Sequence, residues 1–294
     1  MAEHRLAALL GRYLEGGLPA NVALMQLLVE AESAAEVESA IEDRVRRAEP
    51  AGRKRLTALL TLLRAHPDAW ATIRSVMAEA EHDAAGGPAH WAAVFDRLAR
   101  TRPEASVALY ALGSPDILRA ATAEVVERLR LWGLLGRERR LLDIGCGIGR
   151  LALALAPEMA EVVGLDVSGE MIAEARRRGA GYPNTRFVQT DGRDLADMPS
   201  AHVDLVLAAD VFPYLVASAP GLADRHIEEA ARVLRPGGAL LILNYSYRGD
   251  DGLDRADIAA AFGRSGLALE REGTRDFSLW DATAYLGRRR PDAF

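Results

Sequence analysis

The hydrophobic pattern changes character near the middle of this 294-residue chain. Up to about residue 130, apolar positions recur every three to four residues, as in Leu6, Leu9 and Leu10, which is the spacing of amphipathic helices. Prolines and glycines interrupt the pattern, and strict two-residue alternation is absent. We therefore expect residues 1–112 to form an all-helical domain of about six short helices.

From residue 136 onward, short apolar runs alternate with helical periodicity, which is typical of a parallel sheet with helices on both faces. We expect this second domain to cover residues 113–294. Its expected helices are Ile117–Trp132, Leu151–Leu155, Glu170–Arg177, Ile227–Leu234 and Ala256–Phe262. Its expected strands are Arg140–Ile144, Val162–Asp166, Arg186–Thr190, Leu205–Ala209, Ala239–Asn244, Leu267–Glu272 and Ala282–Gly287.

The composition is that of an ordinary globular protein, with 50% hydrophobic and 27% charged residues. The formal net charge of -6 gives no support for a nucleic-acid surface, which usually needs a basic domain. Lys54 is the only lysine, so nearly all basic residues are arginines. Together with heavy alanine and glycine use, this indicates the codon bias of a GC-rich, bacterial genome and not a phosphate-binding surface.

Targeting and cysteine signals are weak. No apolar run approaches the ~18 residues that span a bilayer. The first residues lack the features of a secretory signal, and a single cysteine, Cys146, excludes an internal disulfide. We therefore expect a cytoplasmic protein with no membrane association. No set of clustered carboxylates indicates a metal site.

The segment LLDIGCGIGR, residues 141–150, is the most informative part of the chain. Its apolar run ends in Gly145, Gly147 and Gly149, which predicts a strand, a tight turn and a helix. Glycine adopts positive φ and lets a ligand approach the backbone, while Asp143 lies where open α/β sheets bind ligands. The turn predicts a nucleotide-like ligand. A dinucleotide fingerprint would place the third glycine one residue later, and an acidic residue after the second strand suits either kind of ligand.

Five segments in order carry a more specific signal. They are LLDIGCGIGR, VVGLDVSGEMI (162–172), FVQTDGRDL (187–195), VDLVLAADVFPYL (203–215) and ARVLRPGGALLIL (231–243). Together they resemble the class I S-adenosylmethionine-dependent methyltransferases over about residues 115–290. The resemblance implies a Rossmann-like α/β fold with a seven-stranded, mostly parallel sheet, here preceded by an all-α domain. It also implies S-adenosyl-L-methionine as cofactor and S-adenosyl-L-homocysteine as product, whereas residues 1–100 carry no such resemblance.

The resemblance implies contacts for each part of the cofactor. Gly145, Cys146 and Gly147 would lie along its amino-acid portion, and Asp143 would lie near its ammonium group. Asp166 would accept both ribose hydroxyls, because a carboxylate with two oxygens suits a cis-diol. Alternatively, Asp166 begins a helix. We interpret Cys146, which has no base near it in the sequence, as a small residue in a tight turn and not as a nucleophile.

The adenine and the methyl group would meet later segments of the chain. Val167 and Met171 would pack against the adenine, and Asp191 would accept from its amine beside the Gly192 backbone. The alternative for Asp191 is that it only caps the Asp-Gly turn. The residues expected near the sulfonium and methyl group are Ala209, Asp210 and Val211.

The acceptor side is less defined, and its catalytic residues stay unknown. Candidates for the substrate pocket are Tyr110, Phe212, Tyr214, Tyr245 and Tyr247. Tyr214 and Tyr245 are weak candidates for a general base, because the ordinary pKa of a tyrosine, about 10, is a poor match to neutral pH. His226 has a more suitable pKa, but its helix buries Ile227 and neighbouring apolar residues, so we expect the histidine on a solvated flank.

These observations favour a methyltransferase that acts on a small-molecule acceptor by in-line transfer. One alternative is a protein side-chain methyltransferase with the helical half as docking module. A second is a cofactor-binding scaffold or sensor without catalysis, and a nicotinamide oxidoreductase is a remote fourth hypothesis. The N-terminal helices are interpreted as a lid, a homodimer interface or a substrate-recognition domain. We expect their tryptophans Trp70 and Trp91 in the core.

Overall fold

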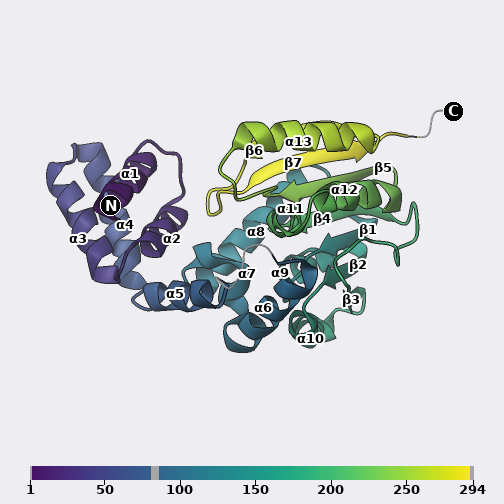
Figure 1. The fold of residues 1–294 in the computed structure, drawn as a ribbon, viewed down its shortest axis with the longest axis horizontal. Coiled ribbons are helices and arrows are strands. Elements are labelled where there is room, and N and C mark those ends of the chain that lie inside the picture. Colours follow the sequence, from purple (N-terminus) through teal and green to yellow (C-terminus); the bar gives the residue numbers. More distant parts are fainter. Residues whose placement is uncertain (1, 81–85, 292–294) are drawn as a thin grey trace. The chain divides into compact units, whose positions relative to one another are not determined.

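The computed structural model describes residues 2–80 and 86–291. Within them the chain forms two compact units, each built from segments that are distant in the sequence (Figure 1). The helical unit comprises 2–80, 102–124 and 277–281, and the α/β unit comprises 86–101, 125–276 and 282–291. This division differs from the single boundary expected after residue 112. Helical periodicity shows that a helix has an apolar face, but it does not show which core that face joins.

The helical unit holds its helices through one apolar core. Leu24, Leu27 and Leu28 are fully buried within it. The third helix begins at Ser33, whose Oγ accepts from the Glu36 backbone N–H at 3.2 Å, as expected for an N-cap. The elements of this unit are α1 (Ala2–Leu14), α2 (Ala20–Glu30), α3 (Ala34–Arg47), α4 (Pro50–Ala65), α5 (Ala69–Ala80), α7 (Pro103–Val107) and the 3-10 turn η1 (Leu109–Ala111), followed by the first part of α8 (Pro115–Leu131).

A buried amide ties the late loop 277–281 into the helical unit. Asn21 Nδ2 donates to the carbonyl oxygens of Tyr110, at 2.9 Å, and Leu279, at 2.7 Å. The Tyr110 ring stacks on Trp280 with a centroid separation of 5.6 Å. Tyr110, expected in the substrate pocket, is therefore a buried residue of this unit.

The α/β unit contains a seven-stranded sheet within the described residues, in the order β3-β2-β1-β4-β5-β7-β6. The first five strands in this order are parallel, and β7 runs antiparallel to both β5 and β6. The expected mostly parallel, seven-stranded sheet is thus confirmed. Its strands are β1 (Gly136–Ile144), β2 (Met159–Asp166), β3 (Thr185–Gln189), β4 (Val203–Ala209), β5 (Leu234–Leu243), β6 (Leu267–Arg275) and β7 (Thr283–Arg289).

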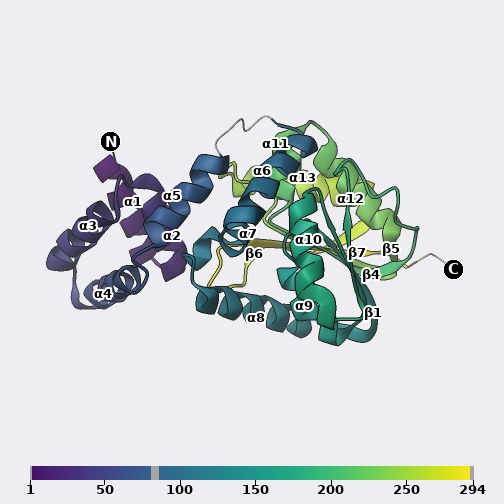
Figure 2. The same cartoon turned by 90° about the horizontal axis from the view of Figure 1, so that it is seen from below.

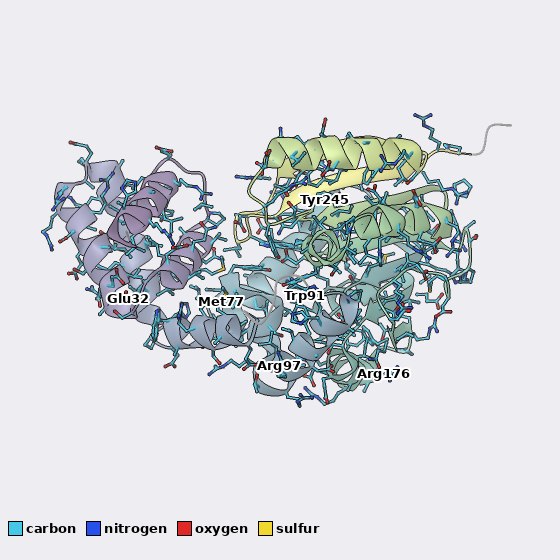
Figure 3. All side chains as sticks on the ribbon, in the orientation of Figure 1. Glu32, Met77, Trp91, Arg97, Arg176 and Tyr245 are labelled. Atoms are coloured by element: carbon cyan, nitrogen blue, oxygen red, sulfur yellow. The ribbon has the colours of Figure 1, made fainter. Side chains whose placement is uncertain are left out.

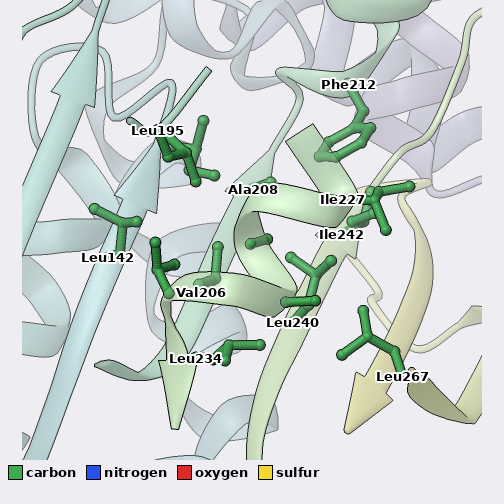
Figure 4. Close-up of a cluster of buried hydrophobic side chains, with 14 of the residues drawn as sticks. Leu142, Leu195, Val206, Ala208, Phe212, Ile227, Leu234, Leu240, Ile242 and Leu267 are labelled. Carbon is green, nitrogen blue, oxygen red and sulfur yellow. The ribbon is translucent and has the colours of Figure 1, made fainter. Parts of the chain in front are cut away.

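Helices cover both faces of this sheet, with α12 and α13 on one face and α9 and α10 on the other (Figures 1 and 2). An apolar cluster places Val206, Ile242 and their neighbours against Ile227 of α12 (Figure 4). Burial on both faces explains why the central strands read as continuous apolar runs. The helices of this unit are α6 (Pro88–Thr101), the end of α8, α9 (Arg150–Leu155), α10 (Gly169–Arg178), α11 (Phe212–Ser218), α12 (Leu222–Val233) and α13 (Asp251–Arg264), with short 3-10 turns after α9 and α10.

Two local expectations are wrong. The expected strand Ala239–Asn244 begins too late, because β5 already begins at Leu234 and includes residues 235–238, where its register with β4 shifts. His226 does not lie on a solvated flank, since it is only 2% exposed. Its Nδ1 lies 2.9 Å from the carbonyl oxygen of Leu222, which fixes the ring against its own helix, and burial lowers its pKa.

Candidate functional site

The glycine turn after β1 is bonded to the end of β2. Gly145, Gly147 and Gly149 have φ of 67°, 53° and 78°, a region that favours residues without a Cβ. The backbone N–H of Cys146 donates to the Leu165 carbonyl at 2.9 Å. A side chain at Gly145 would place its Cβ 2.7 Å from Cβ of Val211. The turn therefore meets both β2 and the segment after β4, at the carboxyl edge of the sheet.

Asp166 connects the two parts of this edge. Its Oδ2 accepts from the Gly147 backbone N–H at 2.8 Å, and its Oδ1 accepts from the Ser168 N–H at 2.9 Å. Burial raises the pKa of Asp166, and these backbone bonds oppose the rise. A carboxylate has about four acceptor positions, so an oriented Asp166 has capacity for further donors such as a ribose diol. These acceptor positions fit the ribose hydroxyls of the cofactor that the sequence indicates.

Asp143 is a buried acid beside the same turn, with 2% of its surface exposed. Burial raises its pKa to about 7, while the positive charge of Arg150 lowers it and the negative charge of Asp166 raises it. A ligand that carries an ammonium group would favour the ionised form of this carboxyl. The chemistry of Asp143 thus fits the amino-acid portion of the cofactor.

The adenine residues expected from the sequence converge at the start of α10. Met171 is buried, and a Cβ on Gly192 would lie 2.6 Å from Val167 Cγ1 and 2.9 Å from Pro88 Cβ of α6. The structure thus brings Val167 and Gly192 together. Asp191 is exposed, and its Oδ1 accepts from the Arg193 N–H at 3.0 Å, so the carboxylate shapes the turn. Adenine recognition by Asp191 stays a prediction.

Helix α6 contributes a residue that the sequence does not reveal. Asp96 Oδ1 accepts from Ser168 Oγ at 2.6 Å and from the Glu170 backbone N–H at 3.1 Å. Arg100 also pairs with Glu170 at 3.1 Å. Because Ser168 is the N-cap of α10 and its N–H bonds to Asp166, Asp96 stabilises the segment that orients the Asp166 carboxylate. The cap at Ser168 could be found from the sequence, but its distant partner could not.

At the ends of β4 and β5, two polar residues adopt left-handed backbone. Asp210 has φ of 55° and Asn244 has φ of 65°. Asp210 Oδ1 accepts from Asn244 Nδ2 at 2.7 Å and from the Tyr247 hydroxyl at 2.9 Å. Asn244 Oδ1 in turn accepts from the Thr283 N–H at 3.0 Å. Strained backbone of this kind costs on the order of 1 kcal/mol or more per residue and is typical of functional sites.

Aromatic rings surround Tyr214, one of the candidates for the substrate pocket. Its ring centroid lies 4.7 Å from Trp91, 5.3 Å from Phe95 and 6.3 Å from Tyr247, each at a steep angle. Trp91 (labelled in Figure 3) is half-buried, so its expected place in the core is wrong. Its Nε1 donates to Ser218 Oγ at 3.2 Å instead. Trp70 is also only half-buried.

The candidate bases have pKa values unsuited to neutral pH. Burial, together with the charge of Asp210, raises the pKa of Tyr214 above its usual value. Burial raises the pKa of Tyr245 to about 12, and this residue packs in the core against Phe212 with a centroid separation of 5.9 Å. Burial also raises the pKa of the Cys146 thiol, which disfavours a thiolate nucleophile.

The described residues contain neither a cluster of metal-binding side chains nor a membrane-spanning helix. Across residues 2–80 and 86–291, no group of three or more His, Cys, Asp or Glu side chains could hold a metal ion. In the same residues, no helix is both long and apolar enough to cross a bilayer.

Comparison with known proteins gives consistent matches. Residues 142–242 match the family model described as a methyltransferase domain. Demethylmenaquinone methyltransferase of Clavibacter sepedonicus is 30% identical over 159 residues, which are 54% of this chain and 59% of that protein. Phosphatidylethanolamine N-methyltransferase of Cereibacter sphaeroides is 35% identical over 127 residues, 42% of this chain and 57% of that protein. The chain therefore matches little more than half the length of these relatives.

A solved structure shares the fold. Phosphoethanolamine N-methyltransferase 1 of Haemonchus contortus, solved with phosphoethanolamine and S-adenosylhomocysteine, superposes with a TM-score of 0.52 at 16% identity, over 69% of this chain and 49% of that one. Strand order, glycine turn and family match define the α/β unit as a nucleotide-binding methyltransferase fold with a Rossmann-like core. Residues 142–242 are thus a methyltransferase domain by this match, and the α/β unit around them has the Rossmann-like fold of the class I S-adenosylmethionine-dependent methyltransferases.

Proposed function

We propose that this protein transfers a methyl group from S-adenosylmethionine to a small-molecule acceptor. The observation that carries the proposal is Asp166, which is buried at the end of β2 and bonded to the backbone of the glycine turn. This arrangement aims an oriented carboxylate at the edge of the sheet where ligands bind in open α/β folds.

The residues of the chain hold each part of the cofactor in this proposal. Asp166 accepts from the ribose hydroxyls, and Asp143 pairs with the ammonium group. Val167 and Met171 contact the adenine, while Asp210 and Val211 face the sulfonium end. The bound cofactor supplies an electrophilic methyl group. The protein's own task is to hold the acceptor in line with it, and such positioning can lower a barrier by roughly 7–11 kcal/mol.

The proposal does not depend on a protein base. Tyr214 and Tyr245 have pKa values raised away from neutrality, and His226 is buried against its own helix. The acceptor nucleophile therefore attacks without prior proton transfer to these groups. The matched relatives are named for a quinone and for a phospholipid amine, so their names do not determine the acceptor class.

Calorimetry with S-adenosylmethionine, S-adenosylhomocysteine and NAD tests the cofactor assignment. We expect the first two to bind and NAD not to bind. Asp166→Ala should weaken S-adenosylhomocysteine binding by about 10- to 100-fold, since hydrogen bonds to charged groups contribute about 1.5–3 kcal/mol. Asp197→Ala is a matched control, because Asp197 is an exposed aspartate of the same unit. Binding of NAD alone, or an unchanged affinity in Asp166→Ala, would refute the assignment.

Catalysis is tested with methyl-labelled cofactor and a panel of small acceptors. Transfer of the label to an acceptor, with one S-adenosylhomocysteine formed per product, supports the proposal. Cofactor binding without turnover on any small acceptor would favour the scaffold hypothesis, and turnover on a protein alone would favour the docking hypothesis.

A further inference from the structure

Helix α6 contacts three loops at the carboxyl edge of the sheet. Its first residue, Pro88, lies against the loop after β3, where a Cβ on Gly192 would approach Pro88 Cβ to 2.9 Å. In its second half, Asp96 bonds to the start of α10, which follows β2. Between these two contacts the helix meets Tyr214 of α11, which follows β4. One helix thus joins the segments to which the proposed function assigns adenine, ribose and acceptor, and the inference below rests on that function.

The spacing of its residues gives α6 two separate contact faces. Trp91 and Phe95 are four residues apart and share one face, and Asp96 and Arg100 are four residues apart and share another. Since each residue turns a helix by about 100°, the two faces diverge by about 100°. The aromatic face packs against α11 and the polar face against α10, which runs alongside α6 (Figure 2). Any rotation of the helix would therefore change both contacts together.

The polar face holds α6 through directional bonds. Asp96 Oδ1 accepts from Ser168 Oγ at 2.6 Å and from the Glu170 N–H at 3.1 Å. The Ser168 N–H in turn donates to Asp166 Oδ1 at 2.9 Å. Hydrogen bonds to a carboxylate are stronger than those between neutral groups. A chain of such bonds therefore runs from α6 to the carboxylate that, in the proposed function, accepts from the ribose.

The aromatic face is less tightly specified. Trp91 and Phe95 are half-buried, and their ring centroids lie 4.7 Å and 5.3 Å from that of Tyr214, both edge-on. Trp91 Nε1 also donates to Ser218 Oγ at 3.2 Å. Edge-on ring pairs are weak and tolerate a range of separations. The position of these rings therefore depends on how the rest of the helix is held.

We propose that α6 couples the cofactor site to the acceptor site, with Asp96 as the positioning residue. A ribose bound to Asp166 orders that carboxylate and the Ser168 segment. Asp96 then holds α6 against this segment, and the helix fixes Trp91 and Phe95 beside Tyr214, where the acceptor binds. The acceptor therefore binds more tightly after the cofactor than before it. By thermodynamic linkage, a bound acceptor strengthens cofactor binding by the same factor.

Fluorine NMR tests the coupling without an acceptor. The protein is labelled with 5-fluorotryptophan, and the Trp91 resonance is identified by its loss in Trp91→Phe. Saturation with S-adenosylhomocysteine should shift this resonance. Asp96→Ala, also saturated, should lose most of the shift. Asp96→Asn, which still accepts from both donors, and the matched control Asp197→Ala should retain it. No shift in the unmodified protein, or a full shift in saturated Asp96→Ala, would overturn the proposal.

Ser168→Ala breaks the same chain of hydrogen bonds at a second point. It removes the hydroxyl that donates to Asp96 and keeps the backbone N–H that bonds to Asp166. Thermal unfolding of each variant verifies that it is folded. If Asp96→Ala does not fold or does not bind S-adenosylhomocysteine, Ser168→Ala decides the question. Its Trp91 resonance should stay close to the ligand-free position at saturation, and a full shift would refute the coupling.

Steady-state kinetics test the acceptor side, with an acceptor identified by the labelled panel. At saturating S-adenosylmethionine, Asp96→Ala should raise the KM for the acceptor by about fivefold or more, the lower end of typical coupling between sites, and Asp96→Asn should stay within about twofold. A purely structural role would lower the stability without changing this KM. An unchanged KM means that Asp96 serves the cofactor alone, which overturns the coupling but leaves the proposed function standing. A failure of the Asp166 experiment removes both.

Discussion

We predict that the buried carboxyl of Asp143 makes cofactor affinity depend on pH. Burial raises the pKa of this carboxyl to about 7 in the free protein, and an ammonium group beside it would lower the pKa again. Cofactor binding is then linked to the loss of a proton. The affinity should rise as the pH rises through 7, level off above it, and fall as the pH drops below it.

The magnitude follows from the pKa. With a pKa of about 7, roughly three-quarters of the Asp143 carboxyls are ionised at pH 7.5 and roughly one-tenth at pH 6.0. If the bound carboxyl stays ionised, the affinity for S-adenosylhomocysteine should fall by about eightfold between these values. About 0.9 proton should be released per binding event at pH 6.0.

Calorimetry at half-unit steps from pH 6.0 to 7.5 measures the affinity, and buffers of different ionisation enthalpy measure the proton release. 5′-Methylthioadenosine, which lacks the amino-acid portion, is the control ligand and should show a flat profile. Asp143→Asn should flatten the profile for S-adenosylhomocysteine. A flat profile for the unmodified protein, or the same slope for both ligands, would refute this role of Asp143.

The packing and titration of other residues lead to three more predictions. Gly145→Ala should lower the free energy of unfolding in urea by about 1–3 kcal/mol more than Gly237→Ala does. Both glycines have positive φ, but of the two only Gly145 faces another side chain at contact distance. Equal losses in the two variants would contradict the close approach of Val211 to Gly145. Asp96→Ala should destabilise the protein by about 1 kcal/mol and weaken cofactor binding. Asp96→Asn still accepts hydrogen bonds, so it should retain most of the stability and most of the cofactor affinity. If neither variant weakens cofactor binding, Asp96 does not position the site. Burial lowers the pKa of His226, so the unfolded chain binds an extra proton and the protein's stability should fall as the pH drops below about 6.5. His226→Gln should remove this part of the pH dependence of the thermal unfolding temperature. The same loss of stability at low pH in His226→Gln would contradict this role.

The domain organisation alters how truncation experiments should be designed. A cut near residue 105 would remove α6 from the α/β unit and leave the loop 277–281 without the helices around Asn21. Such a truncation tests two cores at once. Point variants in the full chain are therefore the appropriate test of the site.

Much of the sheet and of the candidate site could be predicted from local sequence patterns. The alternation of apolar runs and helices predicts the strands, because strands buried on both faces must be apolar along their length. The glycine turn and Asp166 are also local features, since positive φ and a strand-end carboxylate follow from short segments. The structure places both at one edge of the sheet, joined by the hydrogen bond from Gly147 to Asp166.

The burial of individual side chains could not be predicted from these local patterns. His226, which periodicity placed on a flank, is buried, and Trp91, expected in the core, is only half-buried. A helical repeat defines one apolar face, but the width of the buried stripe depends on which elements pack beside it. For Trp91 that neighbour is Tyr214, far along the chain.

By itself, the sequence determined the α/β class, the glycine turn and the resemblance to methyltransferase domains, because these depend on periodicity and on motifs within short segments. Only the tertiary structure decided that α6 belongs with the sheet, that Asp96 accepts hydrogen bonds from Ser168 and Glu170, and that Asp210 accepts hydrogen bonds from Asn244 and Tyr247. These contacts join residues tens of positions apart. Their partners are selected by packing in three dimensions, for which a single sequence holds no local signal.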